Sequence, residues 1–325
     1  MSVLSVRDLE VVYATQAGPI PAVRGVSLEI ETGEVVGLAG ESGCGKSTIV
    51  NAILRLLPPG TTVTGEVLLS GEDILTMKPG RLRAVRWTEA SVVFQGAMHA
   101  LNPVQRIGDQ LAEAIVIHGR AGEREALVRV GSLLEQVGLP PRRLRDYPHE
   151  LSGGQKQRVM IAMALACSPT LVIADEPTTA LDVMVQAQVL RLLKDLQREL
   201  GLAMLFITHD LSVLVEVCDR LAIMYAGKIV EEGPSVEVFG KPAHPYTEAL
   251  AAAFPAIGDP RFRRAPSGLG GDPPQPDAIP AGCAFHPRCP LAFDECPETV
   301  PDLYDAGERR RAACLLIPRG AKVST

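Results

Sequence analysis

The chain has 325 residues, of which 46% are hydrophobic and 22% are charged, so it can bury a core and is not predicted to be disordered. Its net charge of −6 argues against a nucleic-acid partner. The longest unbroken apolar run, residues 159–167, is too short to cross a bilayer, and the first residues show no basic stretch followed by an apolar one. We therefore expect neither a membrane span nor a signal peptide.

Up to about residue 235, short apolar runs alternate with helix-like stretches. Near-continuous apolar strands separated by helices predict a parallel sheet that is covered on both faces. Half-buried strands are expected at 2–14 and 22–31, and 220–233 predicts an antiparallel hairpin that turns at Gly227. The buried strands are expected at 34–40, 90–95, 170–175 and 203–209, and the helices at 47–57, 108–117, 124–138, 153–167 and 183–200.

The composition changes after about residue 255. Twelve of the 26 prolines lie between Pro255 and Pro318, and residues 265–282 have the composition of a linker. We expect a separate small module, residues 283–325, to follow this linker.

The stretch "GESGCGKS", residues 40–47, has the form G-x-x-x-x-G-K-[ST] and stands between a predicted strand and a predicted helix. Its glycines allow backbone N–H groups to surround phosphates. Lys46 can contact the β- and γ-phosphates, and the Ser47 hydroxyl can bind Mg²⁺. The predicted nucleotide-binding residues here are Gly40, Glu41, Ser42, Gly43, Cys44, Gly45, Lys46, Ser47 and Thr48.

Polar residues end the other predicted buried strands. Asp175 and Glu176 follow one strand, which is where nucleotide sites form in open α/β sheets. Asp175 would hold Mg²⁺, and Glu176 would act as general base on the attacking water. Gln95 and His209 end two further strands. If all four strands are parallel, these groups lie along one edge of one sheet.

The stretch "LSGGQ", residues 151–155, precedes an apolar helix. Ser152 and Gln155 fit a capping box, so one interpretation is a well-capped helix. Gly153 and Gly154 also leave bare N–H groups at a positive helix end, so the alternative interpretation is a second anion site.

Taken in order, "GESGCGKS", "FQ", "LSGGQ", "LVIADEP", "ALD" and "THD" resemble an ABC-type ATPase over roughly residues 1–235. The resemblance implies a P-loop α/β fold with a mostly parallel core sheet and an N-terminal antiparallel β subdomain. It also implies an inserted helical subdomain at 96–165. Together with the cysteine-containing extension at the C-terminus, this completes the expected fold.

The resemblance also implies residue roles. Two ATPase subunits would dimerise head to tail, so that Ser152, Gly153, Gly154 and Gln155 of one close on the ATP held by the phosphate loop of the other. Tyr13 would stack on adenine, Gln95 would sense Mg²⁺ and His209 would clamp the γ-phosphate. Ala180, Leu181 and Asp182 would cross the dimer interface. One departure is visible, since Gly96 and Ala97 stand where Asp-Pro often occurs.

Residues 231–250, with "HPYTEAL" at 244–250, and then "GCAFHPRC" resemble the oligopeptide/dipeptide branch of ABC importers, which includes nickel importers. We assign 236–264 to a helical extension. The branch implies ATP-driven import of short peptides at the cytoplasmic face of the membrane. Its implied partners are permease subunits, a second and different ATPase subunit, and an extracytoplasmic peptide-binding protein. The alternative is the same ATPase role in import of nickel or another small solute.

Four cysteines in the tail have the spacing C-x5-C-x6-C-x17-C. Four thiolates suit Zn²⁺ or an iron–sulphur cluster, and the spacing matches neither common pattern, so it does not choose the metal. The resemblance implies a [4Fe-4S] cluster. The tail could also be a redox- or metal-sensing regulatory module. The predicted ligands are Cys283, Cys289, Cys296 and Cys314.

Overall fold

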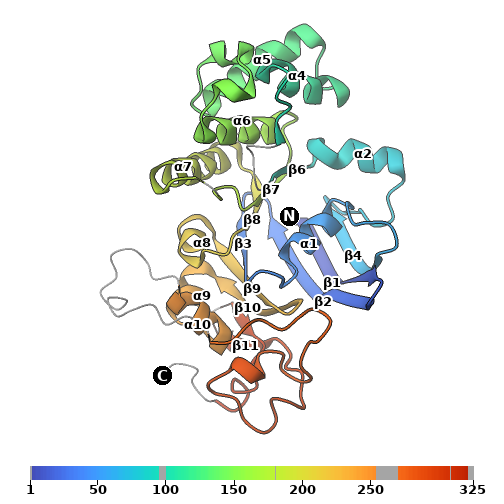
Figure 1. The fold of residues 1–325 in the computed structure, drawn as a ribbon, viewed down its shortest axis with the longest axis vertical. Coiled ribbons are helices and arrows are strands. Elements are labelled where there is room, and N and C mark those ends of the chain that lie inside the picture. Colours follow the sequence, from blue (N-terminus) through green and yellow to red (C-terminus); the bar gives the residue numbers. More distant parts are fainter. Residues whose placement is uncertain (1, 95–99, 180, 254–269, 308, 321–325) are drawn as a thin grey trace. The chain divides into compact units, whose positions relative to one another are not determined.

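The computed structural model describes residues 2–94, 100–179, 181–253, 270–307 and 309–320 (Figure 1). The chain divides into two compact units. One contains residues 1–4, 30–34 and 68–205, and the other contains 5–29, 35–67 and 206–325. No helix in the described part of the chain has both the length and the apolar character that a membrane crossing requires.

The N-terminal sheet is antiparallel and has the strand order β2-β1-β4-β5. The second half of β2 alternates buried and exposed residues, as expected for a strand with one face on a core. The predicted strands 2–14 and 22–31 are confirmed. The strands are β1 (Ser2–Thr15), β2 (Gly18–Glu31), β4 (Thr62–Leu69) and β5 (Glu72–Asp73).

In the unit that contains the phosphate loop, neighbouring strands follow the order β11-β12-β10-β9-β3. Strands β3 and β9 are parallel, with Ala39 paired to Ile223, whereas β9 and β10 form the predicted hairpin. Ala226 and Gly227 both have positive φ at its turn, as a two-residue hairpin of type I′ requires. The strands are β3 (Val35–Ala39), β9 (Arg220–Tyr225), β10 (Lys228–Pro234), β11 (Tyr304–Gly307) and β12 (Arg310–Ala312). The helices are α1 (Lys46–Ile53), α8 (Leu211–Val217), α9 (Ser235–Gly240), α10 (Pro245–Ala253) and the 3₁₀ turn His286–Arg288.

In the other unit, β6 and β7 are parallel, and helices α4, α5 and α6 pack on one another (Figure 1). The unit boundary falls within β8 (Ala203–Ile207). The remaining elements are β6 (Ala90–Val93), β7 (Leu171–Asp175), α2 (Pro79–Thr88), α4 (Ile107–Ile117), α5 (Glu123–Gln136), α6 (Gly153–Leu165), α7 (Val183–Leu200) and the 3₁₀ turns Pro141–Arg145 and Pro148–Glu150.

The tail does not form the separate module that its composition suggested. Strand β12 pairs with β10, so the tail extends the sheet of its own unit. Phe285 is buried against the rings of Tyr225 and Tyr246, with centroids 5.3 and 5.4 Å away. A short, proline-rich segment has too little apolar surface for a core of its own, so it packs on the hairpin instead.

Candidate active site

The phosphate loop links β3 to α1 through two tightly enclosed glycines. A Cβ at Gly40 would lie 2.3 Å from the Met224 carbonyl oxygen, and one at Gly45 would lie 2.5 Å from that of Ala22. Gly45, with φ of 108°, is the N-cap of α1, and no side chain caps this helix. The first amides of α1 are therefore available to an anion.

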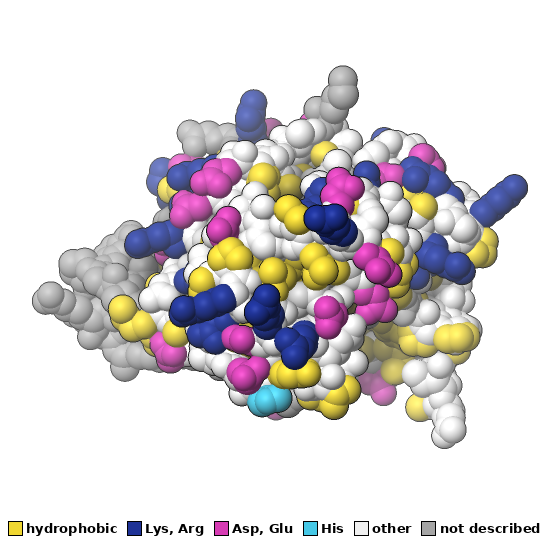
Figure 2. All heavy atoms as spheres, turned by 90° about the horizontal axis from the view of Figure 1, so that it is seen from above, with side chains coloured by type: hydrophobic (Ala, Val, Ile, Leu, Met, Phe, Trp, Pro, Cys, Tyr) yellow, Lys and Arg dark blue, Asp and Glu magenta, His cyan; other side chains and the backbone are white. Residues whose placement is uncertain are grey.

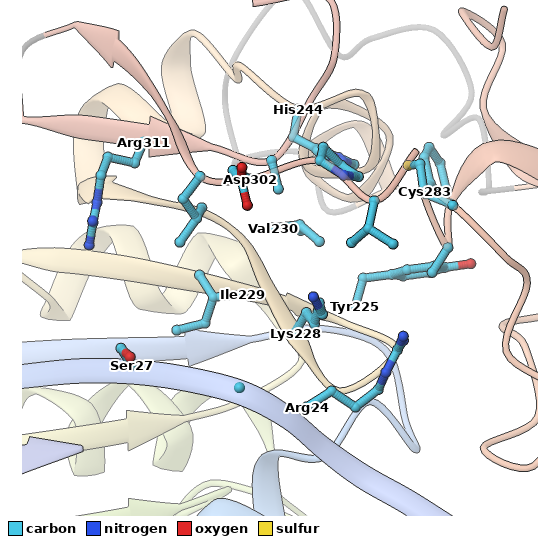
Figure 3. Close-up of a pocket in the computed structure, with 18 of the residues that line it drawn as sticks. Arg24, Ser27, Tyr225, Lys228, Ile229, Val230, His244, Cys283, Asp302 and Arg311 are labelled. Atoms are coloured by element: carbon cyan, nitrogen blue, oxygen red, sulfur yellow. The ribbon is translucent and has the colours of Figure 1, made fainter. Parts of the chain in front are cut away.

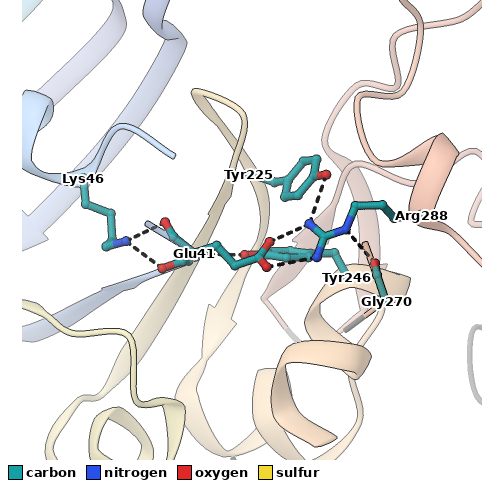
Figure 4. A network of polar contacts seen from close by, with 7 residues as sticks. Glu41, Lys46, Tyr225, Tyr246, Gly270 and Arg288 are labelled. Carbon is teal, nitrogen blue, oxygen red and sulfur yellow. Dashed lines mark hydrogen bonds and ion pairs between the residues drawn. The ribbon is translucent and has the colours of Figure 1, made fainter. Parts of the chain in front are cut away.

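Lys46 folds back onto its own loop. Its Nζ donates to the carbonyl oxygens of Gly40 at 2.6 Å and Glu41 at 3.0 Å (Figure 4), and to Cys44 Sγ at 3.5 Å. These acceptors match its three N–H donors, so the loop holds the lysine until a phosphate replaces them. Burial raises the pKa of the Cys44 thiol, an effect that Lys46 opposes.

Two further candidate residues lie at the same loop. Ser47 is exposed in the first turn of α1, where its hydroxyl can reach a metal ion. Tyr13 Oη donates to Thr48 Oγ1 at 3.2 Å, so the tyrosine on β1 stands beside the loop. His209 belongs to the same unit, is exposed after β8, and precedes Asp210, which caps α8.

The acid pair occupies the end of β7, in the other unit. Glu176 has a left-handed φ of 47°, and its carboxylate accepts a hydrogen bond of 2.8 Å from Thr179 Oγ1. Because β6 and β7 are parallel and pair Val93 with Ala174, Phe94 follows β6 as Asp175 follows Ala174. Gln95 itself lies outside the described residues.

The predicted capping box at α6 is confirmed. Ser152 Oγ accepts from the Gln155 N–H at 3.4 Å, and Gln155 Oε1 accepts from the Ser152 N–H at 3.0 Å. The cap therefore engages amides other than those of Gly153 and Gly154, so the capped helix and the anion site are compatible. A Cβ at Gly154 would lie 2.6 Å from Val185 Cγ1 on α7.

Asp182 is exposed and caps α7, accepting from the Val185 N–H at 3.0 Å. Leu181 lies just before it and donates its N–H to the Thr178 carbonyl oxygen at 3.2 Å. Ala180 lies outside the described residues. One unit thus contains the phosphate loop, Tyr13 and His209, and the other contains the acid pair, the "LSGGQ" helix start and Asp182.

The four tail cysteines line one small cavity of about 20 Å³, together with apolar side chains such as Phe293 and Leu315. Burial is the main cause that raises the thiol pKa values of Cys283, Cys289 and Cys314, that of Cys289 to about 11. Among the described residues, no three His, Cys, Asp or Glu side chains lie close enough to share one metal ion.

A wider cavity of about 270 Å³ shares a wall with this one, because Cys283 and His244 line both (Figure 3). Arg24 on β2 and Lys228 on β10 contribute basic groups to the wider cavity. The thiol cavity is therefore bordered on the Cys283 side by a pocket that is lined by these basic groups and by the carboxylates of Asp8 and Asp302.

Three buried residues at these sites were not identified from the sequence. Tyr246 Oη accepts the Glu41 N–H at 2.9 Å, and Arg288 pairs with the Glu41 carboxylate. Glu231 is fully buried and accepts the amides of Ala243 and His244 at 2.8 and 2.9 Å. Tyr246 lies in "HPYTEAL" and Arg288 in "HPRC", so these two motifs were the available signal.

The phosphate loop, the uncapped helix start behind it and the acid pair after a buried strand define a P-loop ATPase, and "LSGGQ" makes it one of ABC type. The family model described as ABC transporter matches residues 23–179. The chain belongs to the ABC transporter ATP-binding proteins. A second model, described as oligopeptide/dipeptide transporter, C-terminal region, matches residues 230–296 and places it in that branch.

Relatives and solved structures agree with this assignment. A probable peptide ABC transporter ATP-binding protein of Sinorhizobium fredii is 47% identical over 315 residues, covering 96% of this chain and 94% of that protein. A Brucella ovis protein named for peptide import and ATP binding is 44% identical over 326 residues, covering 96% of both.

Among solved structures, the dimeric bacterial ABC transporter cassette MJ0796 has a TM-score of 0.64 at 30% identity. The match covers 71% of this chain and 98% of that one. The same cassette with ADP and phosphate bound, described as a post-hydrolysis state, has a TM-score of 0.62. The cbiO1 cassette of Clostridium perfringens, with a TM-score of 0.64, covers 74% of this chain and 91% of its own. The expected fold is thereby confirmed.

Proposed function

We propose that this chain is the ATP-hydrolysing subunit of an importer of dipeptides and oligopeptides. The observation that carries this proposal is the pairing of a complete ABC ATPase motif set with the C-terminal region of oligopeptide/dipeptide transporters in one chain. The names of its relatives in Sinorhizobium and Brucella support the same substrate class.

The proposed residue roles rest on side-chain chemistry, on the order of the motifs along the chain and on the resemblance to ABC-type ATPases. The first amides of α1 and Lys46 bind the phosphates, and the Ser47 hydroxyl with the Asp175 carboxylate supplies the oxygen ligands that Mg²⁺ prefers. Glu176 removes a proton from the attacking water. His209 contacts the γ-phosphate, Gln95 approaches the metal, and Tyr13 stacks on the adenine ring.

A second ATPase subunit completes each site. The start of α6 and the phosphate loop are two anion-binding surfaces, and head-to-tail pairing lets both act on one ATP. The dimeric form of the solved MJ0796 cassette supports such a pairing. We infer that the partner is a related but different subunit.

The helical subdomain is the proposed contact with the permease. Apolar side chains are exposed on α4 and α5, including Ile117 at 67% and Val128 at 70%. On the face drawn in Figure 2, hydrophobic side chains are interspersed with basic and acidic ones. This contact would hold the chain at the cytoplasmic face of the membrane, with the extracytoplasmic peptide-binding protein acting through the permease.

ATP hydrolysis in the assembled transporter tests this function. With permease, partner subunit and binding protein in proteoliposomes, we expect short peptides to increase ATP hydrolysis several-fold and nickel to leave it unchanged. Stimulation by nickel and not by peptides would instead indicate a nickel importer of the same branch.

We also propose that the four tail cysteines hold a [4Fe-4S] cluster. They fit its donor set, and they surround one apolar cavity. The choice of a cluster over a single zinc ion rests on the resemblance to the oligopeptide/dipeptide branch. Among the described residues, no three His, Cys, Asp or Glu side chains are placed to hold a metal ion. When bound, the cluster would link the four cysteines and so restrain the tail at four positions.

Anaerobic purification tests the cluster. We expect brown protein with iron and sulphide in equal amounts, and Cys289→Ala should lose both. A colourless preparation with one zinc per chain, or with no metal, would contradict the cluster.

A further inference from the structure

The phosphate loop is joined to the cysteine-containing tail by one ion pair. The Glu41 carboxylate, in the second position of the loop, accepts two hydrogen bonds from Arg288, at 2.7 Å from Nη1 and 3.0 Å from Nη2 (Figure 4). A bidentate ion pair of this kind fixes the relative orientation of the carboxylate and the guanidinium as well as the distance between them. The two residues are 247 positions apart.

Arg288 is held on all sides. Its side chain is only 7% exposed, and its Nε donates to the Gly270 carbonyl oxygen at 3.0 Å. The guanidinium lies 5.9 Å from the ring centre of Tyr225 and 6.0 Å from that of Phe285. The bonds to Glu41 raise the pKa of Arg288, so it stays charged.

Glu41 passes this restraint to the phosphate loop. Its N–H donates to Tyr246 Oη at 2.9 Å, and its carbonyl oxygen accepts from Lys46 Nζ at 3.0 Å. The tail therefore restrains Glu41. Lys46 must break its hydrogen bond to the Glu41 carbonyl oxygen before its Nζ can bind a phosphate.

We propose that Arg288 is a positioning residue for ATP binding: it holds Glu41, and through Glu41 the phosphate loop, in the conformation that receives the nucleotide. Removing the guanidinium would leave a partly buried carboxylate without its partner, and the loop would shift to solvate it. Through this contact the tail affects nucleotide affinity directly, although it lies far from the phosphate loop in the sequence.

Calorimetric titration of the full-length chain with a non-hydrolysable ATP analogue and Mg²⁺ tests this. We expect Arg288→Gln to bind about tenfold more weakly, and the transporter carrying it to show a raised KM for ATP with kcat within about twofold of wild type. The matched control is Arg319→Gln, which removes a tail arginine paired with Glu295 and stacked 4.3 Å from the Phe293 ring, and should bind like wild type.

A double-mutant cycle with Glu41→Gln decides whether the effect passes through the pair. Each change breaks the same contact between Glu41 and Arg288. The affinity of the double variant for the ATP analogue should therefore be no lower than that of the single variant with the lower affinity. Wild-type affinity in Arg288→Gln, or additive losses, would overturn the proposal. If Arg288→Gln does not fold, Arg288→Lys takes its place in the test. A lysine keeps the charge but lacks the second hydrogen bond to Glu41, so we expect about threefold weaker binding of the analogue. Unchanged binding would overturn the proposal.

Discussion

At the scale of single residues, local structure and proposed chemistry coincide. Glu176 has a left-handed φ, which is rare for a residue with a side chain and costs about 1–3 kcal/mol. Its carboxylate is restrained by Thr179. A strained residue at the end of a buried strand fits the general-base role proposed for it.

Replacing the carboxylate tests that role. Glu176→Gln keeps the size and the Thr179 contact but removes the proton acceptor, so hydrolysis should fall by about 10²–10⁴-fold while ATP still binds. The variant should accumulate as closed, ATP-bound dimers in gel filtration. Turnover at the wild-type rate would remove Glu176 from this role.

The buried carboxyl group of Glu231 leads us to predict that the free energy of unfolding depends on pH. Burial raises its pKa to about 7, against the backbone hydrogen bonds from Ala243 and His244. Its folded-state pKa therefore exceeds the unfolded value of 4.5, so the folded state binds this proton more tightly. The stabilisation is fully present below pH 4.5 and is lost as the pH rises through 7.

Comparison with Glu231→Gln isolates this effect in urea unfolding between pH 4.5 and 8. The free energy of unfolding of wild type, minus that of the variant, should fall by about 3 kcal/mol over this range. The lowered pKa of His244 is common to both proteins and cancels in the difference. A difference that is constant with pH, or rises, would show that Glu231 is already ionised when folded.

At the scale of helices and strands, sequence predicts what local signals determine. Helix α7 was predicted with the bounds that the structure gives, because Asp182 caps its start and Gly201, with φ of 62°, ends it. Helix α1 was predicted to reach residue 57 but ends at Ile53, with Arg55 in a left-handed conformation. No glycine or proline stands at that end, so no stop signal marks it in the sequence.

Ser152 separates the two interpretations of "LSGGQ". Ser152→Ala should cost about 1 kcal/mol of stability through loss of the cap. Ser152→Asp keeps a good cap but places a negative charge where the partner's γ-phosphate is proposed to lie. We expect it to unfold like wild type in urea yet hydrolyse ATP at least tenfold more slowly in the assembled transporter. Normal hydrolysis by Ser152→Asp would leave only the capping role.

At the scale of the whole chain, the contacts that sequence could not predict are the long-range ones. The tail was expected to stand apart, but β12 pairs with β10 and Arg288 reaches Glu41. No local pattern encodes such partners, because each residue by itself is consistent with a surface loop. The motifs around the phosphates were predictable because their residue types and spacing are set by the chemistry of the nucleotide.

Uptake of a labelled short peptide tests the central claim most directly. Proteoliposomes would contain the permease, the partner ATPase, the binding protein and this chain, with ATP supplied on the cytoplasmic side. Wild type should accumulate peptide only with ATP, and Lys46→Ala should reduce uptake at least tenfold because it removes the phosphate-binding amine. Peptide uptake unchanged by Lys46→Ala, or transport of nickel in place of peptide, would contradict the account.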